Sequence, residues 1–149
     1  FQYRVAHAVY KMPIPIVKQL LQLFCLIWQK VIEITTGISI PASAQIGHSF
    51  YIGHFGGIIL NAKTVVGNNC NISQGVTIGV SGTEERRGVP KIGNNVYIGA
   101  NTIVAGKITI GNDVLIGAAS LMNKDANDNS VWVGVPAVKV SDYGSNGYV

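Results

Sequence analysis

The chain has 149 residues, of which 48% are hydrophobic and only 12% are charged, so it fits one domain and excludes a disordered chain. The net charge is +4, and no cluster of Lys or Arg alternates with aromatic residues, which argues against a nucleic-acid groove. The two cysteines, Cys25 and Cys70, stand far apart in apolar surroundings and are expected to be small buried hydrophobic residues.

Residues 1–36 are predicted to form a helical head, which breaks at Met12-Pro13-Ile14-Pro15. Apolar residues in the second part follow helical spacing, and we expect this helix to pack on its own domain or on a neighbouring subunit. The alternative is a helix that lies on a membrane surface, with basic residues at its flanks. The longest unbroken apolar run, Leu23 to Trp28, is far shorter than the roughly 20 residues that span a bilayer.

From Ile40 onward an aliphatic residue recurs every six positions, a period that fits neither a helix nor an ordinary strand. The period is interrupted by two extra residues before Leu60 and by eight before Ile92. Hexapeptide repeats are typical of parallel β-helices, in which each repeat supplies one strand and one corner. The repeat residues are Ile40, Ile46, Ile52, Leu60, Val66, Ile72, Ile78, Ile92, Ile98, Val104, Ile110, Ile116 and Met122.

Equivalent corners carry similar residues when three repeats are taken to close one coil. Gly67-Asn68-Asn69, Gly93-Asn94-Asn95 and Gly111-Asn112-Asp113 then fall on one corner, where Gly and Asn suit left-handed backbone angles. The sequence therefore predicts one β-helix domain over residues 37–140, capped by the head and closed by the segment from Ser130 to Ala137. Residues 141–149 are expected to be a loose tail.

The same register predicts a column of residues on the outside of the β-helix. His54, Gln74, Ala100 and Ala118 occupy the third position of one corner in successive coils, with Gln74 directly above His54. The two-residue insertion beside His54 makes the local coil bulge, and the small residues above leave a smooth track for an extended ligand. This arrangement favours a catalytic role for His54.

Four motifs in this region resemble those of the serine acetyltransferase branch of the hexapeptide-repeat acyltransferases, over about residues 37–140. The resemblance implies an all-β fold, a left-handed parallel β-helix behind a short helical segment, which assembles as a homotrimer and binds acetyl-CoA between neighbouring subunits. It also implies that His54 is the general base for the acceptor hydroxyl, and that Gln74, Ala100, Ala118 and Lys139 contact the cofactor. The motifs are Phe50-Tyr51-Ile52-Gly53-His54, Gln74-Gly75-Val76-Thr77-Ile78-Gly79, Pro90-Lys91-Ile92-Gly93 and Gly134-Val135-Pro136-Ala137.

The sequence departs from the family pattern at positions that orient the base or hold serine. Ser39 and Gly53 stand where the family has aspartates, and Gly88-Val89 replaces an Arg-His pair. We therefore expect Glu33 or a backbone carbonyl to orient His54. These residues offer no charged groups to pair with the ammonium and carboxylate of an amino acid, which predicts a neutral acceptor.

The leading hypothesis is accordingly an acetyl-CoA-dependent O-acetyltransferase that modifies a sugar hydroxyl in a polysaccharide or glycan. Its acceptor-binding residues are predicted to be Tyr51, Phe55, Arg86 and Arg87. The alternatives are a serine O-acetyltransferase of cysteine biosynthesis and a binding or scaffold protein that has lost catalysis.

No metal site is expected, because His7, His48 and His54 are predicted to lie in different parts of the fold. The charge-dense segment from Val80 to Val89 is either a solvated loop or a flap that reaches across a subunit seam. Without a signal-peptide pattern in the chain, the expected location is the cytoplasm, with the inner face of the membrane as a further option.

Overall fold

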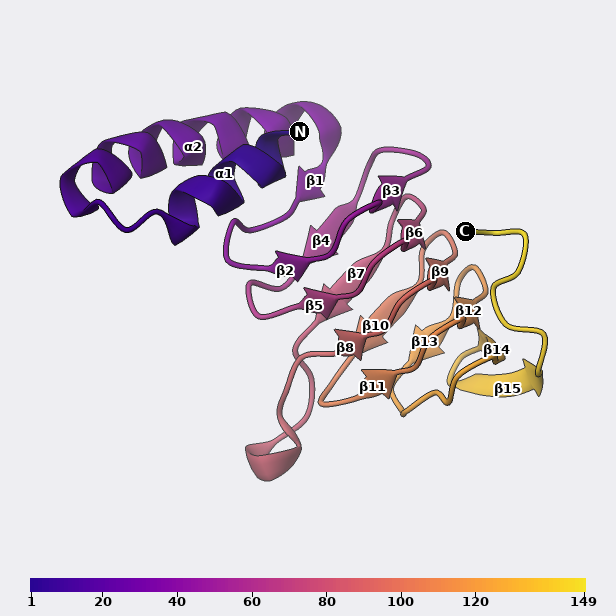
Figure 1. The fold of residues 1–149 in the computed structure, drawn as a ribbon. Helices are drawn as coiled ribbons and strands as arrows, with labels where there is room; N and C mark the ends of the chain where they lie inside the picture. Colours follow the sequence, from indigo (N-terminus) through magenta and orange to yellow (C-terminus); the bar gives the residue numbers. More distant parts are fainter.

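The protein is described by a computed structural model that covers residues 1–149, and it begins with two packed helices. Helix α1 (Gln2–Lys11) and helix α2 (Pro15–Thr36) are separated at the predicted break, with Pro15 in the first turn of α2, where a missing N–H costs no hydrogen bond. Helix α2 ends at Gly37, whose φ of +67° suits glycine. The helical head, residues 1–36, projects beyond one end of the β-structure (Figure 1).

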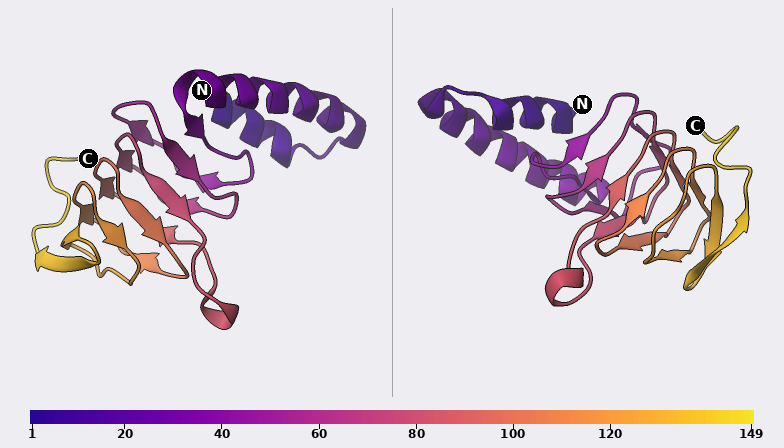
Figure 2. Two further views of the ribbon diagram at one scale, coloured as in Figure 1. Left: turned by 180° about the vertical axis from the view of Figure 1, so that it is seen from behind. Right: turned by 60° about the horizontal axis from the view of Figure 1, so that its bottom comes forward.

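The rest of the chain winds into a prism with three parallel faces, which we call sheets A, B and C. Figure 2 shows the coils stacked from the head to the C-terminal end. Sheet A contains, in order, β1 (Ile38–Ser39), β4 (Ile58–Leu60), β7 (Thr77–Gly79), β10 (Ile103–Ala105) and β13 (Leu121–Met122). Sheet B contains β11 (Thr109–Ile110), β8 (Lys91–Ile92), β5 (Val65–Val66) and β2 (Gln45–Ile46). Sheet C contains β15 (Ala137–Ser141), β14 (Val131–Gly134), β12 (Leu115–Ile116), β9 (Tyr97–Ile98), β6 (Asn71–Ile72) and β3 (Tyr51–Ile52).

The core is a narrow aliphatic column, and this confirms the parallel β-helix. The repeat residues point inward and pair with their equivalents one coil away, as in the series Ile72, Ile98 and Ile116. All of the repeat residues are buried except Ile52, which is partly buried in the coil nearest the head. Parallel strands with β-branched residues on the buried face explain this fit between the repeat period and the core.

The corner between sheets B and C is held by a ladder of side-chain amides. The Oδ1 atom of Asn94 accepts from the backbone N–H of Asn68 at 2.8 Å, and Asn112 Oδ1 accepts from Asn94 N–H at 2.9 Å. Each following residue has a left-handed backbone, with φ near +54° at Asn69 and Asn95. Asn tolerates this conformation better than most residues, which explains its recurrence at this corner.

The head covers the open edge of the first coil, as predicted. The Tyr3 hydroxyl donates to the carbonyl of Ala44 at 2.7 Å and accepts from the N–H of Ile46 at 3.2 Å. Arg4 donates to the carbonyls of Ile46 and Gly47, and the ring of His7 contacts the carbonyl of Ala42 at 2.7 Å. These bonds satisfy backbone groups that an exposed sheet edge would leave free for another strand.

At the other end β14 and β15 form an antiparallel hairpin over the last coil, with Ala137 fully buried. The prediction of a loose tail after Ser141 is wrong, because the tail runs back along the prism (Figure 1). Ser145 is 2% exposed and donates to the carbonyl of Asn95 at 2.5 Å. The ring of Tyr148 lies 4.9 Å from that of Tyr97.

Helix α2 contributes little to the core. Cys25 is its only buried residue, and most of its large apolar side chains are exposed. By length and composition alone, the helix is long and apolar enough to cross a membrane. Its most apolar 18-residue stretch has a mean hydropathy of 1.2, and only 6% of that stretch is buried. The unbroken run from Leu23 to Trp28 is thus a poor measure of this segment, because polar residues interrupt a longer apolar helix.

The close stacking of coils predicts different outcomes for two glycines that both follow a repeat residue. A Cβ on Gly67 would lie 2.4 Å from the carbonyl oxygen of Gly93, whereas a Cβ on Gly79 would have its nearest neighbour, a Thr77 methyl, at 3.8 Å. We expect Gly67→Ala to lower the free energy of unfolding by about 2 kcal/mol or more, because the coils must separate. The matched control Gly79→Ala should change it by less than about 1 kcal/mol. Urea denaturation measures both, and equal effects would contradict this account of the corner.

Candidate functional site

His54 lies at the corner between sheets C and A, in the loop that joins β3 to β4. Its side chain is exposed and its imidazole makes no hydrogen bond within the chain. The loop bulges as predicted, and Gly56 and Gly57 accommodate it with φ values of +108° and +64°. His54 is therefore presented to solvent on an outer corner of a rigid prism.

The predicted column above His54 needs one correction. The backbone ladder pairs the N–H of Gly75 with the carbonyl of Gly56, just as the N–H of Asn101 pairs with the carbonyl of Gln74. Gly56 therefore occupies the corner position beneath Gln74, and the prediction that His54 occupies it is wrong. The insertion lies at the histidine itself, so that His54 and Phe55 form the bulge beside the column.

The remaining column follows the prediction for Gln74, Ala100 and Ala118. The N–H of Ala119 bonds to the carbonyl of Ala100, which continues the same ladder through the next coil. The Oε1 atom of Gln74 is buried without a hydrogen-bond partner, so it remains available as an acceptor next to the bulge. Beyond Gln74 the corner carries only methyl groups, which leaves a shallow track along the prism.

Lys139 lies in the hairpin that extends sheet C past this track. It is paired with Trp132 across the hairpin and forms an ion pair with Asp142. Gly134, at the turn of this hairpin, occupies the position equivalent to Ala118 in the next coil. The structure thus places Lys139 beyond the far end of the track from His54.

The expected orientation of His54 by Glu33 is not seen, because Glu33 bonds elsewhere. Its carboxylate accepts from Lys30 Nζ at 2.6 Å, from Gln29 Nε2 at 2.9 Å and from the Ser39 hydroxyl at 2.8 Å. These bonds, with that from Lys30 the largest influence, hold the pKa of Glu33 below its usual value. A carboxylate is therefore joined to Ser39, the position where the family pattern has aspartate.

The predicted acceptor-binding residues do not come together in one chain. Tyr51 and Phe55 flank His54 and are 60% and 74% exposed. Arg86 and Arg87 lie instead in the loop between β7 and β8, at the corner between sheets A and B. The width of sheet A separates the two groups.

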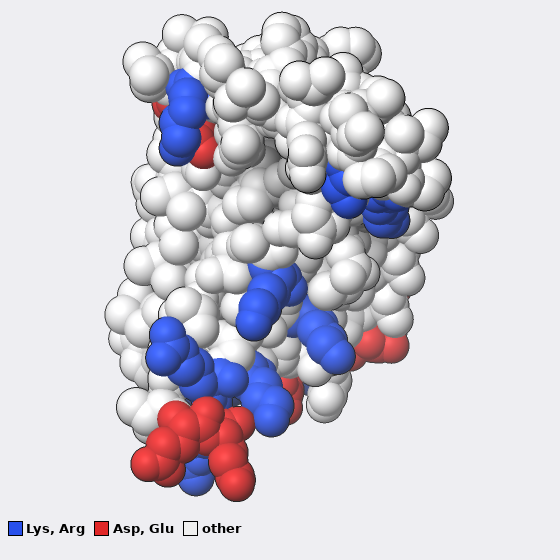
Figure 3. Space-filling view, turned by 90° about the vertical axis from the view of Figure 1, so that its left-hand side faces the viewer, with Lys and Arg blue, Asp and Glu red and all other residues white.

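The loop that carries these arginines projects from the prism (Figure 2). An antiparallel bridge between Ser81 and Gly88 closes its base, and Lys107 Nζ donates to the carbonyl of Glu85 at 3.2 Å. A polar hollow of about 580 Å³ lies beneath it, lined in part by Arg86 and Lys107. Figure 3 shows Lys and Arg gathered on this side of the molecule, with acidic side chains at the tip of the loop.

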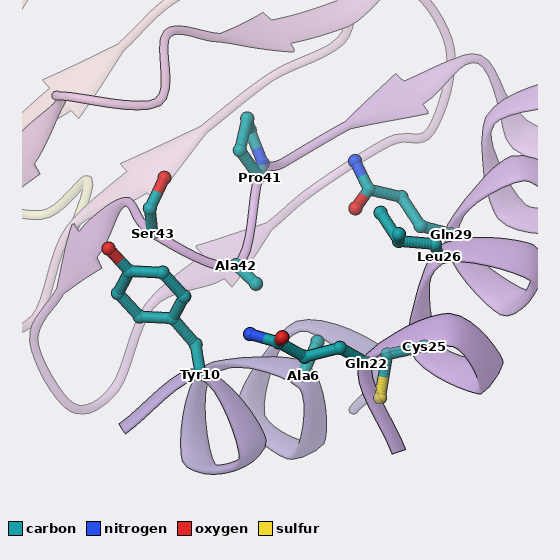
Figure 4. A pocket seen from close by; sticks show the side chains of 9 residues that line it. All are labelled: Ala6, Tyr10, Gln22, Cys25, Leu26, Gln29, Pro41, Ala42 and Ser43. Carbon is teal, nitrogen blue, oxygen red and sulfur yellow. The ribbon is translucent and has the colours of Figure 1, made fainter. Parts of the chain in front are cut away.

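A second cavity, of about 410 Å³, lies between the helical head and the segment from Pro41 to Ser43. Figure 4 shows side chains from α1, α2 and this segment facing one another, among them Tyr10 and Gln22. Neither His54 nor the track residues line it. It is therefore separate from the candidate site.

Comparison with known proteins agrees with this geometry. Residues 90–124 match the family model described as bacterial transferase hexapeptide (six repeats). A serine acetyltransferase from Helicobacter pylori (strain J99) is 32% identical over 139 residues, which are 93% of this chain and 77% of the relative. The chain belongs to the serine acetyltransferase family of hexapeptide-repeat transferases.

A second relative, a serine acetyltransferase from Synechococcus elongatus, is 34% identical over 90% of this chain and 52% of its own length. This chain thus spans only about half the length of some relatives that it matches. A crystal structure of serine acetyltransferase from Brucella abortus superposes with a TM-score of 0.83 at 29% identity, over 97% of this chain and 56% of that one. A serine acetyltransferase in complex with CoA gives a TM-score of 0.77 at 30% identity, over 93% and 54%.

These matches establish the fold as a left-handed parallel β-helix, as the resemblance implied. They also correct the predicted acceptor. The prediction of a sugar hydroxyl is wrong, because the matched relatives and structures are serine acetyltransferases. The prediction rests on the uncharged residues Gly53, Gly88 and Val89, and it assigns Arg86 and Arg87 to the acceptor without finding a partner for the ammonium of serine.

Proposed function

We propose that the chain catalyses transfer of an acetyl group from acetyl-CoA to the hydroxyl of L-serine. The observation that carries this proposal is His54, an exposed imidazole on the bulged corner beside a track of small residues, in a chain of the serine acetyltransferase family. A track without large side chains suits the extended pantetheine arm of CoA. The rest of the site needs residues of a second chain.

In the proposed reaction the neutral imidazole of His54 accepts the proton of the serine hydroxyl as the oxygen attacks the thioester carbonyl. The carbon–sulfur bond then breaks, and the CoA sulfur leaves with the proton returned from the imidazolium. The products are O-acetylserine and CoA, so no metal or redox step is needed to balance the reaction. A positioned base of this kind contributes about 10²–10⁴-fold to the rate.

Serine bears both an ammonium and a carboxylate, and each needs a partner of opposite charge. The loop at the corner between sheets A and B carries Glu84, Glu85, Arg86 and Arg87, which are all exposed. We assign the carboxylate of serine to the arginines and its ammonium to the glutamates. This loop supplies both signs of charge that Gly53, Gly88 and Val89 lack.

The acceptor loop and His54 meet only if two chains combine, and a homotrimer accomplishes this. The outward side chains of sheet A include Ile59 and Ile103, which are 52% and 45% exposed. Leu121 follows Ile103 in the same row, and Thr77 is the polar member between the two isoleucines. An apolar face of this kind is typical of a surface that a neighbour covers. A cyclic trimer with sheet A at the seam would place the loop of one subunit near His54 of the next.

The reaction is tested by steady-state kinetics with acetyl-CoA and L-serine, with free sugars as control acceptors. We expect kcat/KM for L-serine of about 10⁴ M⁻¹s⁻¹ or above, the lower range for a dedicated enzyme.

His54→Ala should lower kcat about 10²–10⁴-fold while the Kd for CoA stays nearly unchanged, because the track binds the cofactor. A folded variant that keeps more than about a tenth of wild-type turnover would show that another group is the base.

The loop assignment predicts a change in KM rather than in CoA binding. Arg86→Gln combined with Arg87→Gln should raise KM for L-serine at least about tenfold, because a charge-assisted pair to the carboxylate is lost. The matched control is Lys63→Gln, an exposed cation on the same side of the prism and outside the loop. Equal KM values in the double variant and the control would place the serine carboxylate elsewhere.

The trimer predicts that sheet A becomes buried on assembly. Sedimentation should give three times the chain mass for the wild type, and Ile59→Glu with Ile103→Glu should give monomers, because the seam would then bury unpaired charges. Val138→Glu, at a side chain that is 53% exposed in the terminal hairpin, serves as the control and should stay trimeric. A monomeric wild type that is fully active would contradict the two-chain site.

A further inference from the structure

Helix α2 turns its apolar side away from the protein. In an ordinary surface helix the apolar stripe packs on the core and polar residues face water. Here Gln22 and Gln29 line the cavity between the head and the prism together with the buried Cys25. The outward side carries a continuous apolar strip, formed by Ile16, Leu20, Leu23, Phe24, Ile27, Val31 and Ile34.

The outward strip is large and has a cluster of aromatic rings beside its middle. Leu20, Phe24 and Ile27 are 69%, 62% and 60% exposed, and the strip follows a helix of 22 residues, about 33 Å long. The ring of Trp28 lies 6.0 Å from that of Phe24 and 6.1 Å from that of Phe1. An exposed apolar surface of this extent marks a site of interaction with a partner or a membrane.

The charge of the head indicates which partner fits. Residues 1–36 contain Arg4, Lys11, Lys18 and Lys30 but only one acidic residue, Glu33, so their net charge is 4 − 1 = +3 of the total +4. Glu33 is already paired with Lys30. Two such heads would repel each other, whereas a bilayer with anionic lipids would attract each of them.

The contacts of the head determine how α2 can meet a bilayer. Its inner side packs on α1, and Tyr3, Arg4 and His7 of α1 are bonded to the first coil of the prism. Crossing a membrane would require α2 to separate from α1 and from β1, whereas lying along the surface preserves this packing. The outward strip can enter the interface while the flanking lysines remain at the level of the lipid headgroups.

We propose that α2 is a membrane-surface anchor, which lies in the interface of a bilayer rich in anionic phospholipid and holds the enzyme at that surface. Apolar burial and electrostatic attraction act together in such anchors, so binding depends on both lipid charge and salt. This role is independent of the acceptor and of the chemistry at His54.

The test is flotation of the full chain with vesicles of phosphatidylcholine alone or of phosphatidylcholine and phosphatidylglycerol in equal amounts. We expect the wild type to float only with the phosphatidylglycerol vesicles and to be released by high salt. Leu20→Gln, Phe24→Gln and Ile27→Gln together should lower the bound fraction at least about tenfold, since each buried apolar side chain contributes to insertion. Val138→Gln, Val140→Gln and Tyr143→Gln together, at exposed residues outside the head, should bind as the wild type does.

A second variant keeps the proposal testable if the triple variant does not fold. Lys11→Glu with Lys18→Glu leaves the apolar strip intact and should also lower binding at least about tenfold. Unchanged binding by a folded variant of either kind would overturn the proposal, as would a wild type that binds neither vesicle. The strip would instead contact a second copy of the chain if the wild type binds no vesicles and the variant with a polar strip sediments as a smaller assembly than the wild type.

Discussion

The structure depends on its corners, where the backbone is left-handed and hydrogen bonds join each coil to the next. The amide side chains at Asn68, Asn94 and Asn112 accept hydrogen bonds from neighbouring coils and keep the corner in register. Glycine precedes them because the next coil leaves no room for a Cβ. Once the corners are fixed, the inward side chains of successive coils lie directly above one another, and together they form the aliphatic column.

The interior of the prism is filled by its aliphatic column, so a ligand can bind only on the outside of the prism or between chains. His54 occupies one corner, and the charged loop with Arg86 and Arg87 occupies another, with sheet A between them. In the proposed trimer each corner provides only part of an active site. Assembly around the apolar seam would then join the base, the cofactor track and the acceptor loop, and would leave the helical head free at one end.

The repeat period was sufficient to predict the core and the corner between sheets B and C, because each repeat residue obeys the same local rule. The position of His54 was harder to predict. A two-residue insertion can be placed before or after a residue without changing the repeat count, and only the bond from Gly75 to Gly56 resolves it. The tail was also unpredictable, since its order depends on one serine and one tyrosine that meet distant coils, Ser145 and Tyr148.

The acceptor was predicted wrongly for a physical reason. Three uncharged positions favour a neutral acceptor only if the whole site lies in one chain, whereas in the proposed trimer the loop between β7 and β8 supplies charge from a different corner of another chain. The outward apolar side of α2 was likewise ambiguous in sequence, because helical spacing gives the direction of a stripe relative to the helix and not relative to the protein. Gln22 and Gln29 face inward only because the first coil and α1 lie on that side.

The central claim is that two chains build one site, and mixed trimers test it most directly. One parent carries His54→Ala, the other carries Arg86→Gln and Arg87→Gln, and activity is measured at low L-serine, where both parents are nearly inactive. If each site takes its base from one subunit and its loop from the next, equal mixing leaves one seam in four intact and should restore about a quarter of wild-type activity. Mixed trimers with no more activity than the two parents would contradict the account.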